Sequence, residues 1–262
     1  MLLFTNVFST FKGLVVTKNT GFSFALLTLF FVLIADDANG QRRVGVKDSV
    51  LLAGLVDINF GGTLPAGDLK DRFGGNGITG ASILIKNRKN WLFGSEVIFL
   101  FGNKVREDDI LDGIKTESGF IIGSDGLLYV ANLNQTGYFI SGQFGKVTKL
   151  FQSNVNSGVT VLGGFGFMQH RINIDTEEDN VPQLQGDLKK GYDRLSNGVA
   201  LSQFIGYYHF GSGRFINFHV GFEFIQAFTK SRRDFDIDQQ SVDTKSRLSL
   251  IHISEPTRHR RI

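Results

Sequence analysis

The feature of this 262-residue chain that most limits its fold is a strict alternation of apolar and polar residues in short segments. In the clearest segment, residues 216–224, five apolar residues alternate with four polar or small ones: Ile216, Phe218, Val220, Phe222 and Phe224 against Asn217, His219, Gly221 and Glu223. Successive side chains of a strand point to opposite faces of a sheet. The pattern therefore predicts a strand with one apolar and one polar face.

The same alternation recurs along the chain and predicts seven visible strands, at residues 50–60, 76–86, 91–102, 136–149, 157–172, 198–210 and 214–228. Most reach the roughly 9–11 residues that a tilted strand needs to cross a bilayer. The links alternate in length: 61–75, 103–135 and 173–197 are long, and 87–90, 150–156 and 211–213 are short. This rhythm is typical of barrels with tight periplasmic turns and long outer loops.

Three features favour a membrane barrel over a soluble β-barrel or sandwich, which has the same periodicity with the apolar face turned inward. The apolar faces are rich in phenylalanine, of which the chain has 26, and the polar faces are rich in glycine and small residues. Aromatic residues lie near expected strand ends, where an interface girdle belongs: Trp91, Tyr138, Tyr207 and Phe228. We expect an all-β, antiparallel up-and-down transmembrane β-barrel in the outer membrane. Because a barrel must close, about eight strands are expected in the intact protein.

The N-terminal residues resemble a secretory leader. Lys12 and Lys18 precede an apolar run at 21–35, and small residues follow at 38–40. This order predicts a cleaved signal peptide at residues 1–40. A permanent helical anchor is the alternative, but the apolar run is shorter than the roughly 20 residues of a spanning helix.

The C-terminal residues resemble something other than protein-coding sequence. Residues 248–258, LSLIHISEPTR, look like the translation of a sequencing adapter. We expect residues 248–262 to be a non-native, adapter-derived tail and the barrel domain, residues 41–247, to be C-terminally truncated. An ordinary basic tail is the alternative. No function is therefore assigned to His252, His259 or the terminal arginines.

Composition excludes several classes of site. The chain has no cysteine, so disulfides and thiolate metal sites are excluded. The net charge of +3 falls to about +1 without the two ends, so nothing indicates nucleic-acid binding. We expect no cofactor and no metal site, because no nucleotide-binding or EF-hand spacing is present.

Residues 41–247 resemble the opacity and OmpA/OmpX-like class of outer-membrane β-barrel proteins in their strands and loop rhythm. The segment KGYDRLSNG at 190–198, the strand GYYHF and the segment GFEFIQAFTKSRR also resemble uncharacterised barrels of Bacteroidota-type bacteria. The resemblance implies a Gram-negative outer-membrane address. It implies no catalytic residues. The partners expected are outer-membrane lipid, lipopolysaccharide and the barrel-assembly machinery, and the extracellular partner is unknown.

The polar faces carry a set of residues expected to meet inside the barrel: Asp57, Lys86, Glu96, Gln143, His170, His219 and Glu223. Buried charges need partners, so these residues are expected to form a rigidifying network. A narrow conduction path, or a proton-sensitive latch of His219 and Glu223, is the alternative. Those two residues are expected about 13 Å apart along one strand.

The long loops are the expected contact surface. In 173–197 the candidate contact residues are Lys190, Tyr192, Asp193 and Arg194, of which Asp193 and Arg194 are also expected to pair and order the loop. An acidic patch beside basic residues could hold calcium or lipopolysaccharide phosphates, although solvated loop charge explains it as well. In 103–135, Asp109 is expected to cap a short helical turn.

Three functions are consistent with this barrel. The leading hypothesis is a non-enzymatic barrel, structural or surface-binding through its long loops. The first alternative is a porin-like or transport barrel with further strands beyond those visible. The second is a lipid A-modifying hydrolase at the rim, built from His170, Ser196 and Asp175.

Overall fold

The computed structural model describes residue 50 and residues 52–149, 154–176, 180–210 and 217–261. The expected signal peptide lies outside these residues. The chain divides into two compact units, Met1–Arg43 and Val44–Ile262, and the description below concerns the second. In the ranges described, no helix combines the length and apolarity needed to cross a membrane.

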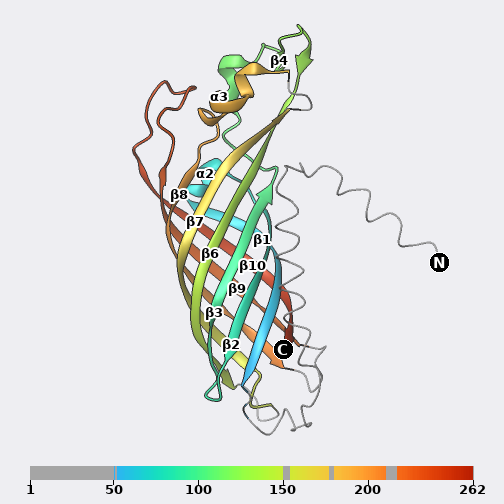
Figure 1. Ribbon diagram of the computed structural model, residues 1–262, viewed down its shortest axis with the longest axis vertical. Helices are drawn as coiled ribbons and strands as arrows, with labels where there is room; N and C mark the ends of the chain where they lie inside the picture. Colours follow the sequence, from blue (N-terminus) through green and yellow to red (C-terminus); the bar gives the residue numbers. More distant parts are fainter. Residues whose placement is uncertain (1–49, 51, 150–153, 177–179, 211–216, 262) are drawn as a thin grey trace, which may run out of the picture. The chain divides into compact units, whose positions relative to one another are not determined.

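Eight strands form a closed antiparallel barrel in the order β1-β10-β9-β8-β7-β6-β3-β2 (Figure 1). Their bounds are β1 Ala53–Gly67, β2 Asn76–Lys86, β3 Trp91–Gly102, β6 Ala131–Lys149, β7 Gly158–Thr176, β8 Ser196–Phe210, β9 Asn217–Ser231 and β10 Ser246–Arg261. Strands that follow one another in this ring pair side by side, so no sheet edge is left open. The expected antiparallel up-and-down barrel is confirmed.

All seven expected strands are present, and several are longer than the alternation suggested. β1 continues to Gly67, so its link to β2 is residues 68–75 rather than 61–75. Gly61 and Gly62 lie within this strand, opposite Ile78 and Gly77 of β2. A Cβ atom at Gly61 would lie 2.5 Å from the Ser254 carbonyl oxygen of β10, so this position requires glycine for close strand approach.

The count of seven visible strands was wrong, because residues 246–261 form an eighth. β10 pairs with β9, for example Leu248 with Phe228, and with β1, for example Ile253 with Thr63. This strand covers the segment that resembles an adapter translation and that was therefore left out of the strand count. That residues 248–262 are non-native stays a prediction.

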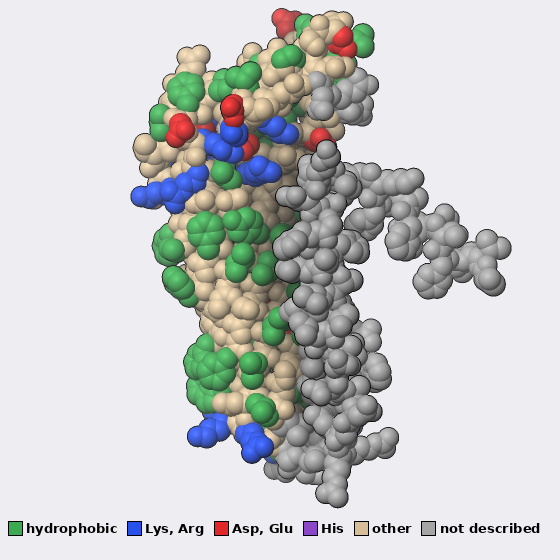
Figure 2. All heavy atoms as spheres, viewed as in Figure 1, with side chains coloured by type: hydrophobic (Ala, Val, Ile, Leu, Met, Phe, Trp, Pro, Cys, Tyr) green, Lys and Arg blue, Asp and Glu red, His purple; other side chains and the backbone are tan. Residues whose placement is uncertain are grey.

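The outer wall of the barrel is apolar. Large hydrophobic side chains stay exposed along every strand, among them Phe60 at 56%, Phe165 at 64% and Phe222 at 59%. Figure 2 shows such side chains along the visible wall. Water-soluble proteins rarely expose apolar patches of this extent. The expected lipid-facing direction of the phenylalanine-rich faces therefore agrees with the structure.

The interior is layered along the barrel axis, which the alternation did not predict. On β3, the inward-facing side chains include Leu92, Glu96 and Ile98 in that order, and all three are buried. Leu92 belongs to an apolar cluster at the short-turn end, and Ile98 belongs to a second cluster toward the long loops. The polar residues around Glu96 thus form a belt between two apolar layers.

The long connections gather at one end of the barrel and carry the remaining elements (Figure 1). These are α2 Leu69–Arg72, the 3-10 helices η1 Asp109–Ile114 and η2 Pro182–Leu184, the hairpin strands β4 Ile121–Ile122 and β5 Leu128–Tyr129, and α3 Gly186–Lys190. The helical turn expected near Asp109 is η1. Asp109 is its first residue rather than its cap, and the capping position, Asp108, makes no side-chain cap hydrogen bond.

Candidate functional site: the polar belt and the loop clamp

Two groups of polar side chains stand out in the described residues. The first, the polar belt, lies inside the barrel and comprises Asp57, Asn59, Ser82, Glu96, Ser141, Gln143, Ser202, Tyr208, His219 and Glu223. The second, the loop clamp, lies under the long loops and comprises Arg72, Glu107, Asp193, Arg194, Arg233, Asp236 and Asp238. The structure places all seven expected interior residues within the barrel, none more than 7% exposed.

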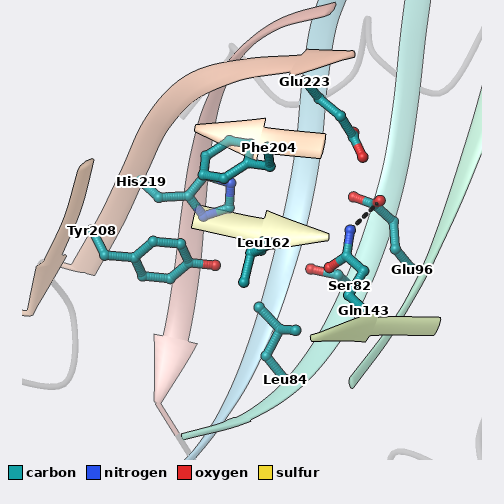
Figure 3. A pocket seen from close by; sticks show the side chains of 9 residues that line it. All are labelled: Ser82, Leu84, Glu96, Gln143, Leu162, Phe204, Tyr208, His219 and Glu223. Atoms are coloured by element: carbon teal, nitrogen blue, oxygen red, sulfur yellow. Dashed lines mark hydrogen bonds between the residues drawn. The ribbon is translucent and has the colours of Figure 1, made fainter. Parts of the chain in front are cut away.

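Asp57 is the centre of one half of the belt. Its Oδ2 accepts hydrogen bonds from Ser82 at 3.2 Å and from the Tyr208 hydroxyl at 3.1 Å. The Nδ1 of His219 lies 3.9 Å from the same oxygen, and its ring stacks on Tyr208 with 4.6 Å between centroids. His219 of β9 is thus engaged with Asp57 of β1, which lies on the other side of β10 in the ring. Figure 3 shows His219 on the opposite side of the pocket from Glu96.

Glu96 is the centre of the other half. Its Oε1 accepts a hydrogen bond from Asn59 at 2.7 Å, and its Oε2 accepts one from Gln143 at 2.6 Å. The three side chains come from β3, β1 and β6. Hydrogen bonds to a buried carboxylate offset part of its desolvation cost. Figure 3 shows Glu223 of β9 with its carboxyl group turned toward Glu96.

Lys86 closes the short-turn end of the interior. Its Nζ donates to Asn156 Oδ1 at 2.9 Å and lies 5.7 Å from the centre of the Phe210 ring. Asn154 in the same turn donates to the Phe210 carbonyl at 2.6 Å. The turn between β6 and β7 is thereby tied to the end of β8.

The belt leaves almost no free space. A cavity of about 10 Å³ lies among Ser82, Leu84, Glu96, Gln143, Leu162, Phe204, Tyr208, His219 and Glu223 (Figure 3). This is the room that one water molecule needs. Apolar layers lie on both sides of this cavity along the barrel axis.

The residues of the hydrolase alternative do not form a triad. His170 is buried, with its Nε2 3.4 Å from the Ser249 hydroxyl. The Ser196 hydroxyl donates to the Arg194 carbonyl at 3.1 Å and accepts from Arg72 at 3.1 Å. Asp175 is exposed on the outward face of β7, whereas His170 points inward. No general base is therefore aligned with the serine and the carboxylate.

The loop clamp connects all four long connections. Arg194, before β8, pairs with Glu107 of the β3–β6 connection at 3.4 Å and with Asp236 of the β9–β10 connection at 2.9 Å, and also contacts Asp238. Arg72, in the β1–β2 connection, pairs with Glu107 at 3.3 Å and donates to the Arg194 carbonyl at 3.1 Å. The clamp holds the loops together over the mouth of the barrel.

The expectation that Asp193 and Arg194 pair with each other was wrong, because each has its ion-pair partner on another segment. Asp193 accepts two hydrogen bonds from the guanidinium of Arg233, one of them at 2.7 Å. A two-pronged contact of this kind is among the stronger and more directional polar contacts. The side chains of Asp193 and Arg194 point in different directions. Asp193 therefore contacts Arg233, and Arg194 contacts Asp236.

Burial and partners shift the pKa values of the clamp in opposite directions. Burial lowers the pKa of Arg72 despite the charge of Glu107. Burial also lowers the pKa of Arg194. The hydrogen bond to Asp238 and the charges of the nearby carboxylates outweigh burial, so the pKa of Arg194 is raised overall. Burial raises the pKa of Asp236 against the effect of Arg194. The arginines stay charged, and the clamp is a set of buried ion pairs.

Three of the four candidate contact residues lie beneath the surface. Tyr192, Asp193 and Arg194 are each at most 6% exposed, and only Lys190 is exposed, where it pairs with Asp187 at 2.5 Å. Glu107, Arg233 and Asp236 were not identified from the sequence. Glu107 lies in the charged run at 106–109, and Arg233 and Asp236 lie in the charged run at 232–238. Neither run reveals the partners of these residues.

Solved structures that the chain resembles include two outer-membrane proteins. One is Ail, the attachment invasion locus protein of Yersinia pestis, in complex with the heparin analogue sucrose octasulfate: 9% identity, TM-score 0.35, covering 79% of this chain and 98% of Ail. The other is the outer membrane protein OprG from Pseudomonas aeruginosa: 12% identity, TM-score 0.36, covering 79% of this chain and 96% of OprG. No family model and no curated protein matches the chain.

The class of the protein follows from its own geometry. Eight antiparallel strands close on themselves, the wall around them exposes phenylalanine, valine and isoleucine, and the interior holds a hydrogen-bonded polar belt. Short turns lie at one end and long connections at the other. The chain is an eight-stranded β-barrel of the outer-membrane type.

Proposed function

We propose that this protein is a non-enzymatic outer-membrane barrel that presents its clamped loops as a binding surface outside the cell. The observation that carries the proposal is the combination of an apolar outer wall with an interior whose cavity measures about 10 Å³. An eight-stranded barrel has an interior just wide enough for side chains. The filled interior argues against the porin-like alternative.

The hairpin β4–β5 supports a role in surface contact. Ile122 and Leu128 pair across this hairpin, and Phe120 and Val130 continue the same face. All four side chains are exposed, between 36% and 59%, whereas Ile121 and Tyr129 on the other face are buried. An exposed apolar patch at the loop end of the barrel is suited to contact with another protein.

Basic side chains above the apolar wall support a second contact, with lipopolysaccharide. Asn197 pairs with Gln169 of β7 and with Lys230 of β9, and Arg232 Nε donates to Asn197 Oδ1 at 2.5 Å. Lys230, Arg232 and Arg171 are exposed just beyond the lipid-facing Phe167 and Phe228. Cations at this level fit the phosphate groups of the outer leaflet. Insertion by the barrel-assembly machinery is part of the same proposal.

Two measurements test the proposal. In planar bilayers the purified protein should produce no stable conductance, and large steady channels would refute the closed interior. Cells that display the protein should attach to a protein-coated surface better than cells that display the double variant Ile122→Ser and Leu128→Ser. Equal attachment, with equal amounts of both proteins at the surface, would remove the role assigned to the hairpin.

A further inference from the structure

A second, unassigned cleft lies outside the barrel, beside the part of β6 and β7 that rises beyond the other strands (Figure 1). Its volume is about 540 Å³, and its polar lining includes Asn103, Asp108, Lys115, Asn132, Asn134 and Asp175. This volume lies within the range of small-molecule sites, roughly 300–1,000 Å³. The cleft is separate from both the polar belt and the loop clamp.

The floor of the cleft is a rigid two-strand surface. Asn132 of β6 pairs with Asp175 of β7, and Asn134 follows on the same outward face of β6. Asn103 continues the line of β3 beyond the pair Gly102–Gln135, which brings it beside Asn134. Strands hold the directions of Asn132, Asn134 and Asp175, so two amides and a carboxylate are arranged before any ligand arrives. Asn103 adds a third amide from the bend that follows β3.

These side chains are not used to hold the fold. Within the described part of the chain, the side chains of Asn103, Asn132, Asn134 and Asp175 take part in no hydrogen bond and no ion pair. The residues around them are engaged: Asn76 donates to Gln135 at 2.5 Å, and Lys115 donates to the Asp108 carbonyl at 3.0 Å. The cleft therefore offers open donors and acceptors on a supported frame.

The chemistry of the lining selects a ligand class. An amide side chain both donates and accepts hydrogen bonds, and each oxygen of a carboxylate accepts them. This set matches hydroxyl groups, each of which can donate and accept a hydrogen bond. Lys115 lies 3.6 Å from Asp112, and Asp108 and Asp175 add two further negative charges. The negative balance disfavours sulfated, phosphorylated or sialylated sugars. We propose that this cleft binds an uncharged oligosaccharide.

The inference rests on the outward-facing loop end of the proposed function, but its test does not depend on the membrane. The full chain, refolded in detergent micelles, is applied to an array of neutral and sialylated oligosaccharides. A separate titration uses oligosaccharide released from the outer-membrane glycolipid of the producing cell. Binding of neutral oligosaccharides with rejection of sialylated ones is expected. Binding of the released sugar would identify the source as the cell's own surface, and binding of array sugars would identify it as a partner's glycan. Binding of both would mean that the cleft accepts sugars from either source.

Variants connect binding to the cleft. The double variant Asn132→Ala and Asn134→Ala should bind at least about tenfold more weakly, because two hydrogen-bonding amides are lost. The control Gln239→Ala removes an exposed amide in the β9–β10 connection and should bind as the wild type does. Asp175→Asn should reduce the rejection of sialylated sugars, with Asp187→Asn as its control. Heat-dependent migration on gels checks that each variant folds.

Three outcomes overturn the inference. The first is the absence of binding to any oligosaccharide by folded wild-type protein. The second is a preference for sialylated over neutral sugars. The third is unchanged affinity of the folded Asn132→Ala and Asn134→Ala variant. None of these results affects the conductance and attachment measurements, so a failure of this site is distinguishable from a failure of the proposed function.

Discussion

Arg194, between β7 and β8, forms an ion pair with Asp236, between β9 and β10, with 2.9 Å between Nη1 and Oδ2. Both side chains are almost fully buried, at 4% and 2% exposed. Removing charges from water is expensive, so a buried pair adds little net stability, but losing one partner leaves an uncompensated charge. The pair therefore fixes where two loops lie relative to each other.

Substitution Arg194→Met should open the loop clamp. The buried carboxylate of Asp236 would lose its partner, which typically costs about 3–5 kcal/mol. We expect faster trypsin cleavage within residues 232–245 and a lower unfolding midpoint in urea. Lys190→Met is the matched control, because Lys190 pairs with Asp187 on the open surface. The same change in cleavage for both variants would show that the clamp does not order the loops.

The ion pair between Asp243, in the β9–β10 connection, and Arg247, at the start of β10, should weaken in acid. Burial raises the pKa of Asp243, but its ion pair with Arg247, with 2.5 Å between Nη1 and Oδ2, outweighs burial and lowers the pKa overall. A carboxyl group with a lowered folded-state pKa stabilises the fold above its unfolded pKa, about 3.9, and this stabilisation is lost as the pH falls through the folded value.

The variant Asp243→Asn tests this predicted loss of stability at low pH. The difference in unfolding midpoint between wild type and variant should be largest near neutral pH and should shrink below about pH 4. Unfolding curves in urea at several pH values measure it. A difference that grows as the solution becomes acidic would mean that Asp243 is not stabilised by Arg247.

The outer wall predicts a strong effect of charge at Phe222, which is 59% exposed on β9. Phe222→Arg should cost roughly 2–4 kcal/mol, the cost of a basic side chain on the lipid face near the bilayer midplane. Refolding into lipid vesicles, followed by gel migration with and without heating, measures assembly. Phe222→Leu keeps the face apolar and should assemble normally. Normal assembly of the arginine variant would contradict a lipid-facing position.

The hydrogen bonds of Glu96 in the polar belt predict that two substitutions at this position lower the free energy of unfolding by different amounts. Glu96→Leu leaves the buried amides of Asn59 and Gln143 without this acceptor, at about 1–3 kcal/mol for each unsatisfied group. Glu96→Gln retains one acceptor oxygen and should cost less. Denaturant unfolding of both variants measures the order. A leucine variant as stable as the glutamine variant would show that the belt's hydrogen bonds contribute no net stability.

What the sequence by itself determined about this protein is its fold class and the direction of its faces. The alternation around Phe222 and Glu223 is local, because neighbouring residues of a strand must face opposite sides. It therefore indicated which side chains meet lipid and which point inward. The lengths of the links likewise indicated which end carries the long loops.

The alternation gave the facing but not the layers where both faces are apolar. Ile83 and Ile85 face out, as the alternation with Ser82 and Lys86 places them, but only the barrel shows that Leu84 packs into an apolar layer inside. The two apolar layers that close the interior were missed for this reason.

Only the tertiary structure decided which polar groups meet. His219 contacts Asp57 and Arg194 contacts Asp236 because barrel closure and loop folding bring distant segments together. The open cleft beside Asn132 and Asp175 also depends on strand register and on the loop that roofs it. Residue types and spacing along one strand carry no record of such partners, since the partners lie on other strands.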